Sequence, residues 1–428
     1  MDKGLVRSQA ARRRSGSGEI FSTVAIAGLT LAAAIIGGVD VASAETASAA
    51  NATPAAPAPA PPAPKSIYDR IWALPKLYSN PANPWIEELS IVGREQVDFY
   101  HFDADQGDAT NFVNRRTRIG LKALMFKTVT AHVETDLDFH ENAGACKDPT
   151  TGSGCDEVYT KLTDAYVKWS PRKWLNLTVG KHGAKFTLDG STSSTQLITI
   201  DRSNVANNFW FPDEYIPGVS VSGDVGKWSY NAGIFTAGDQ NSEFSDFKGD
   251  YFVLVSGGYD LNSIVGIDKA LIRLDYVYQN PDPQNDFTRP NEHVLSLSTQ
   301  WEKGRWGLYT DVDYADGYGT QSDLVGGQIM PAVKLFETWQ VVLRYTGISS
   351  DDPNGIRLAR YENKVVGVSN GKPVGDEYHE IYLGLNKYFY GHKLKWQTGL
   401  QYANMDDAPH DGGHYNGWGV TTGLRISW

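Results

Sequence analysis

The sequence contains few cysteines, fewer basic than acidic residues and almost no long apolar runs. Its 2 cysteines among 428 residues are too few for a disulfide-rich scaffold or a cysteine-based metal cluster. The formal net charge of -11 argues against a nucleic-acid partner, because proteins that bind nucleic acids are usually basic. Only one apolar stretch, near the N-terminus, approaches the roughly 20 residues of a membrane-spanning helix, which excludes a polytopic helical transporter.

Aromatic residues and glycine are abundant, with 22 tyrosines, 12 tryptophans and 43 glycines. The mean hydropathy is nevertheless only -0.37. In transmembrane β-barrels the lipid-facing and lumen-facing residues alternate, so the hydropathy averages out along each strand. The composition therefore favours a membrane barrel.

The first 88 residues are expected to lie outside the main domain. Three arginines at positions 12–14, the apolar stretch 20–36 and the small residues 42–44 form the three-part pattern of a secretory signal peptide. A membrane anchor is the alternative for this segment. We expect four parts: a signal peptide (1–44), an Ala/Pro-rich linker (45–64), a short periplasmic bridge (65–88) and a transmembrane β-barrel domain (89–428).

From residue 89 onward, apolar and polar residues alternate in short segments, which is typical of β-strands. Most segments have about 10 residues, enough to cross a bilayer when tilted, and short connections alternate with long polar loops. Because backbone groups in lipid must all be paired, the sheet has to close. We therefore predict an all-β fold, a 16-stranded antiparallel transmembrane β-barrel of the outer-membrane porin type. The predicted strands are 89–101, 113–126, 128–139, 160–170, 174–182, 216–225, 228–236, 250–260, 269–279, 291–301, 305–315, 323–335, 339–348, 377–388, 393–404 and 416–428.

The alternation also assigns side chains to a face of the wall. In the segment 128–139, Val133 and Leu137 would face lipid, while His132, Glu134 and Asp136 would face the lumen. A charge on the lipid face costs about 2–4 kcal/mol at the membrane midplane, so charged side chains are expected to point inward.

The last strand carries an assembly feature. Its apolar residues share one face, and the chain ends on Trp428. An aromatic terminus resembles the signal that the outer-membrane barrel assembly machinery reads. We therefore expect this machinery and outer-membrane lipid to be partners, with Trp428 as the assembly signal.

Several segments resemble the phosphate-selective porin O/P family. The segments that carry the resemblance are 115–121 (RRTRIGL), 162–169 (LTDAYVKW), 177–181 (LTVGK), 192–194 (TSS), 201–203 (DRS) and 218–235. The resemblance implies sixteen strands, a homotrimer in the bacterial outer membrane and a channel selective for anions, phosphate among them. The family's "KxPFG" piece is replaced by residues 183–188 (GAKFTL), so selectivity is the least transferable property.

The loop 183–215 is the third external loop, which in sixteen-stranded porins folds inward and narrows the pore. Its charged members include Lys185, Asp189, Arg202, Asp213 and Glu214. Loops of this length without secondary structure are usually functional or disordered. We expect the loop to fold inward, and an external cap is the alternative.

The predicted second strand presents Arg116, Arg118 and Lys122 on one face. Guanidinium groups about 7 Å apart could pass an anion from one to the next. The alternative is that they pair with carboxylates of the neighbouring strand, such as Glu134 and Asp136. The candidate residues of the anion path are Arg116, Arg118, Lys122, Lys168, Lys185, Arg202, Arg273 and Arg344.

Cys146 and Cys155 lie in the second external loop, where an oxidising compartment favours a disulfide. No metal site, cofactor or catalytic residue is expected, since the histidines accompany no nucleophile motif such as G-x-S-x-G. The sequence thus predicts a non-enzymatic porin for small hydrophilic solutes or inorganic anions. The alternatives are a structural or adhesive barrel and an outer-membrane enzyme of the lipase type.

Overall fold

The computed structural model describes residues 66–137, 159–209, 214–237, 243–245, 248–285, 288–353, 355–367, 373–406 and 415–428. The expected signal peptide and linker, the cysteines Cys146 and Cys155, and Asp213 lie outside these residues. Among the described residues, no helix is long and apolar enough to cross a membrane.

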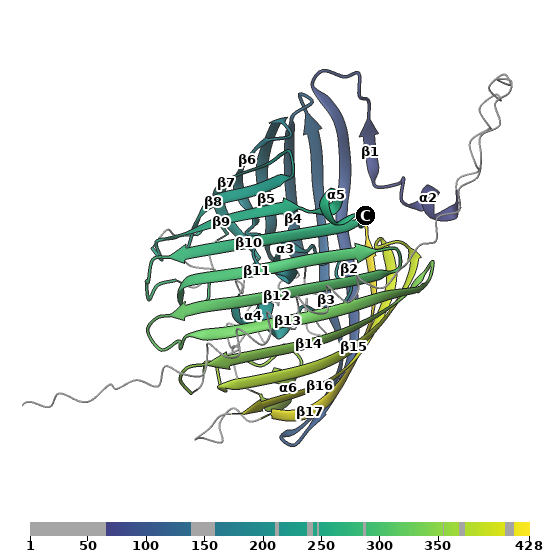
Figure 1. The fold of residues 1–428 in the computed structure, drawn as a ribbon. Helices are drawn as coiled ribbons and strands as arrows, with labels where there is room; N and C mark the ends of the chain where they lie inside the picture. Colours follow the sequence, from purple (N-terminus) through teal and green to yellow (C-terminus); the bar gives the residue numbers. More distant parts are fainter. Residues whose placement is uncertain are drawn as a thin grey trace, which may run out of the picture.

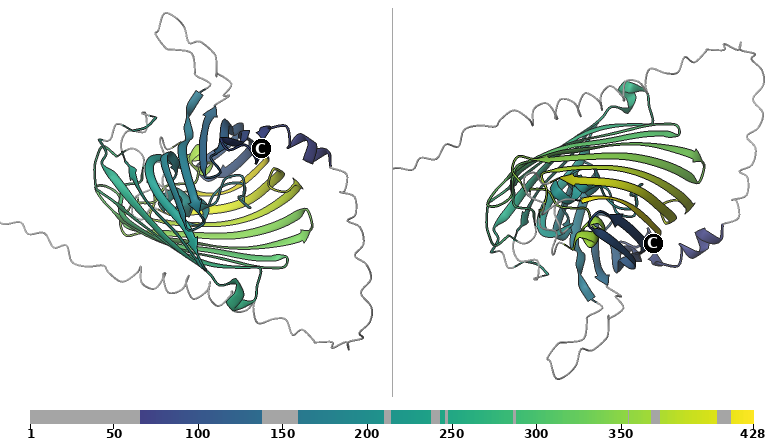
Figure 2. Two further views of the ribbon diagram at one scale, coloured as in Figure 1. Left: turned by 90° about the horizontal axis from the view of Figure 1, so that it is seen from above. Right: turned by 90° about the horizontal axis from the view of Figure 1, so that it is seen from below.

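Sixteen consecutive antiparallel strands, β2 to β17, form the wall of a closed barrel (Figures 1 and 2). The strands are β1 (Lys76–Ser79), β2 (Ile86–Ala104), β3 (Gly107–Met125), β4 (Val129–Leu137), β5 (Tyr159–Arg172), β6 (Leu175–Gly183), β7 (Tyr215–Val225), β8 (Trp228–Thr236), β9 (Tyr251–Asp260), β10 (Lys269–Gln279), β11 (Asn291–Lys303), β12 (Trp306–Gly317), β13 (Leu324–Phe336), β14 (Trp339–Ser350), β15 (Glu377–Tyr390), β16 (Leu394–Asp406) and β17 (Tyr415–Ser427). The short helices are α2 (Ile67–Ile71), α3 (Leu188–Ser191), α4 (Asn204–Phe209), α5 (Asn262–Val265) and α6 (Glu362–Val366).

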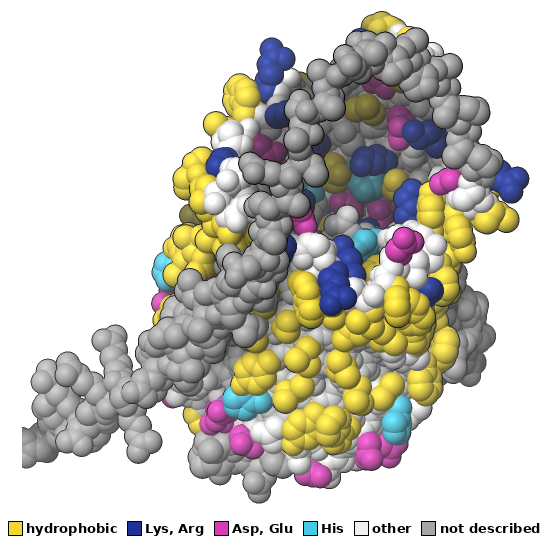
Figure 3. Space-filling view, turned by 45° about the vertical axis from the view of Figure 1, so that its right-hand side comes forward, with side chains coloured by type: hydrophobic (Ala, Val, Ile, Leu, Met, Phe, Trp, Pro, Cys, Tyr) yellow, Lys and Arg dark blue, Asp and Glu magenta, His cyan; other side chains and the backbone are white. Residues whose placement is uncertain are grey.

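The predicted alternation of faces is confirmed along the wall. On β15, Ile381 and Leu383 are exposed on the outer surface, whereas Glu380 and Tyr382 are buried in the interior. Successive side chains of a strand point to opposite faces, so the apolar residues face lipid and the polar residues face the lumen. Figure 3 shows the result, an outer wall dominated by apolar side chains beside a hollow that contains charged ones.

The barrel closes where β17 pairs with β2. The Trp428 backbone N–H donates to the Gly93 carbonyl oxygen at 3.1 Å, and the Gly93 N–H donates to the Trp428 oxygen at 3.3 Å. The Trp428 ring covers Gly93 so closely that a Cβ atom on Gly93 would lie 2.6 Å from it. The last residue therefore fills a place on β2 that only glycine leaves open.

Two parts of the chain differ from the sequence prediction. β2 and β3 each have 19 residues and meet in a tight hairpin at Asp105 and Gln106, so the predicted loop 102–112 is mostly strand. The predicted bridge 65–88 contains α2, β1 and the start of β2. β1 pairs with β2 at Glu88 to Ser90, beyond the point where β17 ends.

The segment containing α2 is tied to the closure seam. A capping box between Ser66 and Asp69 starts the helix. The Trp72 Nε1–H donates to the Ser427 carbonyl oxygen at 2.6 Å, and the Tyr68 ring stacks on Tyr390. The residues before the barrel thus contact the end of β15 and the end of β17.

We predict that Gly93→Ala impairs barrel closure. The added Cβ would lie 2.4 Å from the Arg118 carbonyl oxygen and 2.6 Å from the Trp428 ring, and overpacking of this kind costs about 1–3 kcal/mol. The fraction of heat-modifiable folded barrel on a gel should fall. Gly257→Ala is the matched control, because a Cβ there meets nothing within 4 Å. Equal folding of the two variants would contradict the role of this contact.

Candidate functional site

The described residues of the loop between β6 and β7, 184–209 and 214, cross the interior of the barrel (Figure 1). The Leu188 N–H donates to Asp311 Oδ2 of β12 at 2.7 Å. The Asn386 side chain of β15 donates to the Ile198 carbonyl oxygen at 2.7 Å. Contacts with these distant strands place the loop inside the lumen, as expected, rather than as an external cap. We call it the inward loop.

Apolar side chains anchor one part of the inward loop. Phe186, Val205 and Phe209 are buried in a cluster that includes Phe235 of β8 and Ile348 of β14. Burying a large apolar side chain stabilises a structure by about 1.5–3 kcal/mol. The apolar side chains of the loop are therefore removed from water only because the loop packs inside the barrel.

Arg202, inside the inward loop, joins residues near the two ends of this loop. The Arg202 guanidinium pairs with Glu214, and its Nε–H donates to the Asp189 carbonyl oxygen at 2.9 Å. Arg116 of β3 lies 3.6 Å from the same Glu214 carboxylate. Burial opposes ionisation of Glu214, but Arg202 and Arg116 outweigh it and hold its pKa below the ordinary value. The carboxylate thus stays charged and fixes the loop to the wall.

The arginines of β3 are held by neighbouring groups. Arg118 lies 3.2 Å from Asp136, which is directly opposite it on β4, and donates to the Tyr215 hydroxyl at 2.8 Å. Arg116 donates to Gln96 at 2.9 Å in addition to facing Glu214. Pairing with a wall carboxylate therefore applies to Arg118, whereas Arg116 binds the loop.

Arg115 is a site residue that the sequence prediction missed. A β-bulge interrupts the register between β2 and β3, so that Arg115 has no partner in the ladder. Its guanidinium lies 3.4 Å from Asp201 of the inward loop, and Arg360 lies 3.5 Å from the same carboxylate. Burial opposes ionisation of Asp201, yet Arg115 and Arg360 keep its pKa well below the ordinary value. The sequence prediction named Arg116 and Arg118 of this basic run as site residues and did not include Arg115, although its place in the run was a signal.

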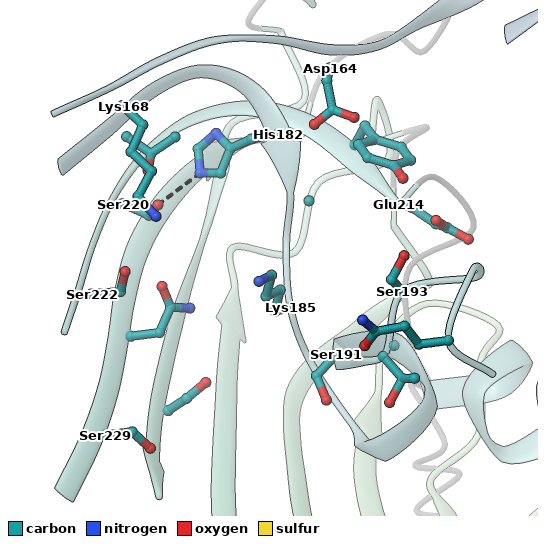
Figure 4. Close-up of a pocket in the computed structure, with 18 of the residues that line it drawn as sticks. Asp164, Lys168, His182, Lys185, Ser191, Ser193, Glu214, Ser220, Ser222 and Ser229 are labelled. Carbon is teal, nitrogen blue, oxygen red and sulfur yellow. Dashed lines mark hydrogen bonds between the residues drawn. The ribbon is translucent and has the colours of Figure 1, made fainter. Parts of the chain in front are cut away.

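The inward loop separates three hollows. The first, which we call the lysine hollow, has a volume of about 600 Å³ (Figure 4). The second, the balanced hollow, has about 640 Å³, and the third, the arginine hollow, has about 120 Å³. The Arg202–Glu214 pair lines both the lysine hollow and the arginine hollow. This ion pair therefore lies between the arginine hollow, which is near the long loops, and the lysine hollow, which is near the short turns.

The hollows differ in charge. Among its described lining residues, the lysine hollow has five cationic side chains and two acidic ones, namely Arg94, Lys168, Lys185, Arg202 and Arg273 against Asp164 and Glu214. The balanced hollow has three of each, namely Lys269, Arg273 and Lys334 against Asp189, Glu302 and Glu337. The arginine hollow has Arg115, Arg116, Arg202 and Arg360 against Asp201 and Glu214. The positive excess is thus local to two of the three.

The remaining predicted path residues fall into three groups. Arg344 pairs with Glu380 at 2.9 Å, and Arg273 with Asp275 at 2.7 Å. Lys122 is exposed and lines none of the three hollows. Within the described residues, the side chains of Lys168 and Lys185 make no hydrogen bond or ion pair, and both point into the lysine hollow (Figure 4).

Asp189 serves the loop rather than the pore. Its carboxylate accepts the Ser203 N–H at 2.8 Å and the Gln328 amide at 3.3 Å. It is buried and joins two turns of the inward loop to β13.

Residues 90–255 match the model of a family described as phosphate-selective porin O and P. The resemblance to this porin family is confirmed. The family match and the barrel indicate the bacterial outer membrane. No curated protein matches the chain.

Solved porin structures share the fold. OprB of Pseudomonas putida has a TM-score of 0.54 at 11% identity, over 79% of this chain and 94% of that chain. An anion-selective porin from Comamonas acidovorans has a TM-score of 0.53 at 11% identity, over 79% and 99%. The channel DcaP of Acinetobacter baumannii has a TM-score of 0.50 at 13% identity, over 82% and 100%. The predicted sixteen-stranded porin barrel is confirmed.

We predict that Glu214→Gln loosens the inward loop. Removing one partner of a buried ion pair costs about 3–5 kcal/mol, because the remaining charge is left uncompensated. Single-channel recordings should show a larger mean conductance and more flicker. Glu362→Gln is the control, since burial raises the pKa of this carboxyl on α6 to about 8, so that it is already largely neutral near pH 7. An unchanged Glu214→Gln channel would show that the ion pair does not hold the loop.

Proposed function

We propose that this chain is a porin through which small hydrophilic solutes diffuse passively, with a preference for inorganic anions that include phosphate. The observation that supports the preference is the lysine hollow, where the side chains of Lys168 and Lys185 make no hydrogen bond or ion pair among the described residues. Charges are screened beyond about 8 Å at physiological salt. Local charge therefore affects permeation more than the net charge of -11.

The proposal includes the parts of the chain outside the barrel. Residues 1–44 act as a signal peptide, 45–64 as a linker in the periplasm, and the barrel assembly machinery inserts a homotrimer into outer-membrane lipid. The family resemblance supports the trimer, and the contacts of Trp428 with Gly93 support the assembly role of the last residue. Cys146 and Cys155 form a disulfide in an external loop.

The chain is proposed to have no enzymatic activity. A lipase-type enzyme would need a nucleophile, a base and an acid in hydrogen-bonded sequence. The Nε2 atom of His182 hydrogen-bonds the Ser220 hydroxyl at 2.8 Å. The other ring nitrogen hydrogen-bonds the Gly180 carbonyl oxygen rather than an acidic side chain. This geometry supports a channel over an enzyme, and conductance in a planar bilayer separates the channel from an adhesive barrel.

We predict that the double replacement Lys168→Glu and Lys185→Glu shifts the zero-current potential in a KCl gradient toward cations. The lysine hollow would then hold three cationic and four acidic side chains, which reverses its sign. Lys227→Glu is the control, because it makes the same kind of charge change on an exposed turn. Phosphate should also reduce the chloride current of the wild-type channel. A wild-type channel that prefers cations, or a double variant with unchanged selectivity, would contradict the proposal.

A pH dependence follows from Lys185, which lies on the inward loop outside the membrane-spanning strands. Burial lowers its pKa below the ordinary value of 10.5, and Arg273 and Lys168 lower it further. Its positive charge is present at low pH and is lost at a lower pH than for an exposed lysine. We predict that anion preference declines as the pH rises from neutral toward 10.5. Lys185→Arg should resist this decline, because arginine stays charged, and an equal decline in both channels would contradict the assignment.

A further inference from the structure

A group of three potential metal ligands lines the pore wall at the lysine hollow. His132 and Glu134 lie two residues apart on β4, and Asp164 lies directly opposite Glu134 on β5. One ligand atom from each of these residues lies within 4.8 Å of the other two. His132 and Asp164 also line the hollow itself, and Figure 4 shows the Asp164 carboxylate at its edge.

Two of these side chains lack the partners that burial normally demands. The Asp164 side chain is only 8% exposed, and among the described residues it makes no hydrogen bond or ion pair. The His132 Nε2 atom is buried without a hydrogen-bond partner, 3.4 Å from Glu134 Oε2. Buried polar groups are nearly always paired, and like charges directly opposite each other destabilise a sheet. Arg94 offsets the charge of Glu134, but no positive side chain among the described residues pairs with Asp164.

Neighbouring side chains leave one atom of each ligand directed to the centre. The His132 Nδ1 atom lies 3.3 Å from the Tyr166 hydroxyl, which leaves Nε2 for an ion. The Arg94 guanidinium donates to Glu134 Oε1 at 3.2 Å, which leaves Glu134 Oε2 for the ion. A partner on the second ring nitrogen is typical of metal-bound histidines, because it fixes the tautomer and the ring orientation.

We propose that His132, Glu134 and Asp164 bind a divalent transition-metal ion of the zinc class in the pore wall. One imidazole and two carboxylates suit such ions, with bonds of about 2.0–2.2 Å. Small side-chain rotations would bring atoms now within 4.8 Å to that distance. Three protein ligands leave a coordination position for water, so the ion would exchange with the hollow.

A bound ion would add positive charge to the lysine hollow. Its effect on conduction would therefore be to strengthen anion preference, which makes the site regulatory rather than catalytic. The competing explanation is an imidazolium of His132 that bridges the two carboxylates without any metal. Both explanations use the same contacts, so metal binding has to be measured directly.

The test is isothermal titration of ZnCl2 into purified full-length barrel, free of any histidine tag, at neutral pH. We expect saturable binding of one ion per chain. His132→Gln and Asp164→Asn should each weaken the affinity at least about tenfold, as losses in a metal site generally do. Heat-modifiability of each variant confirms that its barrel has folded.

His182→Gln is the matched control, because this histidine lines the same hollow but has partners on both ring nitrogens. It should bind zinc as the wild type does. In planar bilayers, zinc should shift the zero-current potential toward anions in the wild type and not in Asp164→Asn. Absence of saturable binding, or binding that survives both His132→Gln and Asp164→Asn, would overturn the proposal. The titration does not depend on channel activity, so its result stands apart from the proposed function.

Discussion

The requirement that every backbone group in lipid be hydrogen-bonded governs the rest of this structure. It forces sixteen strands into a closed sheet, and the closing pair is β17 with β2. β1 continues the pairing of β2 beyond the end of β17. Once the sheet is closed, the alternation of side chains divides the residues of each strand between lipid and lumen. Charged residues in the middle of the strands, such as Arg344 and Glu380, therefore lie inside.

Most of the charge inside the barrel serves to hold the structure together. Arg425 pairs with Asp98, Arg344 with Glu380 and Arg118 with Asp136. The inward loop is fixed by the same means through Arg202 and Glu214. A buried charge that loses its partner is costly, so these groups are not available to a passing ion. Counting charges along the strands therefore says little about selectivity.

The sequence predicted the strands well because their pattern reflects a physical constraint that acts on each strand separately. All sixteen predicted strands are present, and the faces of His132, Glu134 and Asp136 were assigned correctly. The missed features depend on pairing between strands. The bulge that turns Arg115 inward and the register that sets Asp164 opposite Glu134 are properties of two strands at once. The route of the inward loop depends on partners as distant as Asn386.

The division between arginine and lysine explains which charges remain for permeation. A guanidinium presents a rigid fork of donors, so it suits sites where several acceptors converge, as Arg202 shows with Glu214, Asp189 and Thr192. A lysine ammonium is compact and strongly hydrated, so it can stay in a water-filled space without a fixed partner. Lys168 and Lys185 are of this second kind. The arginines then give the hollow its shape, and the two lysines give it a charge that a solute anion can meet.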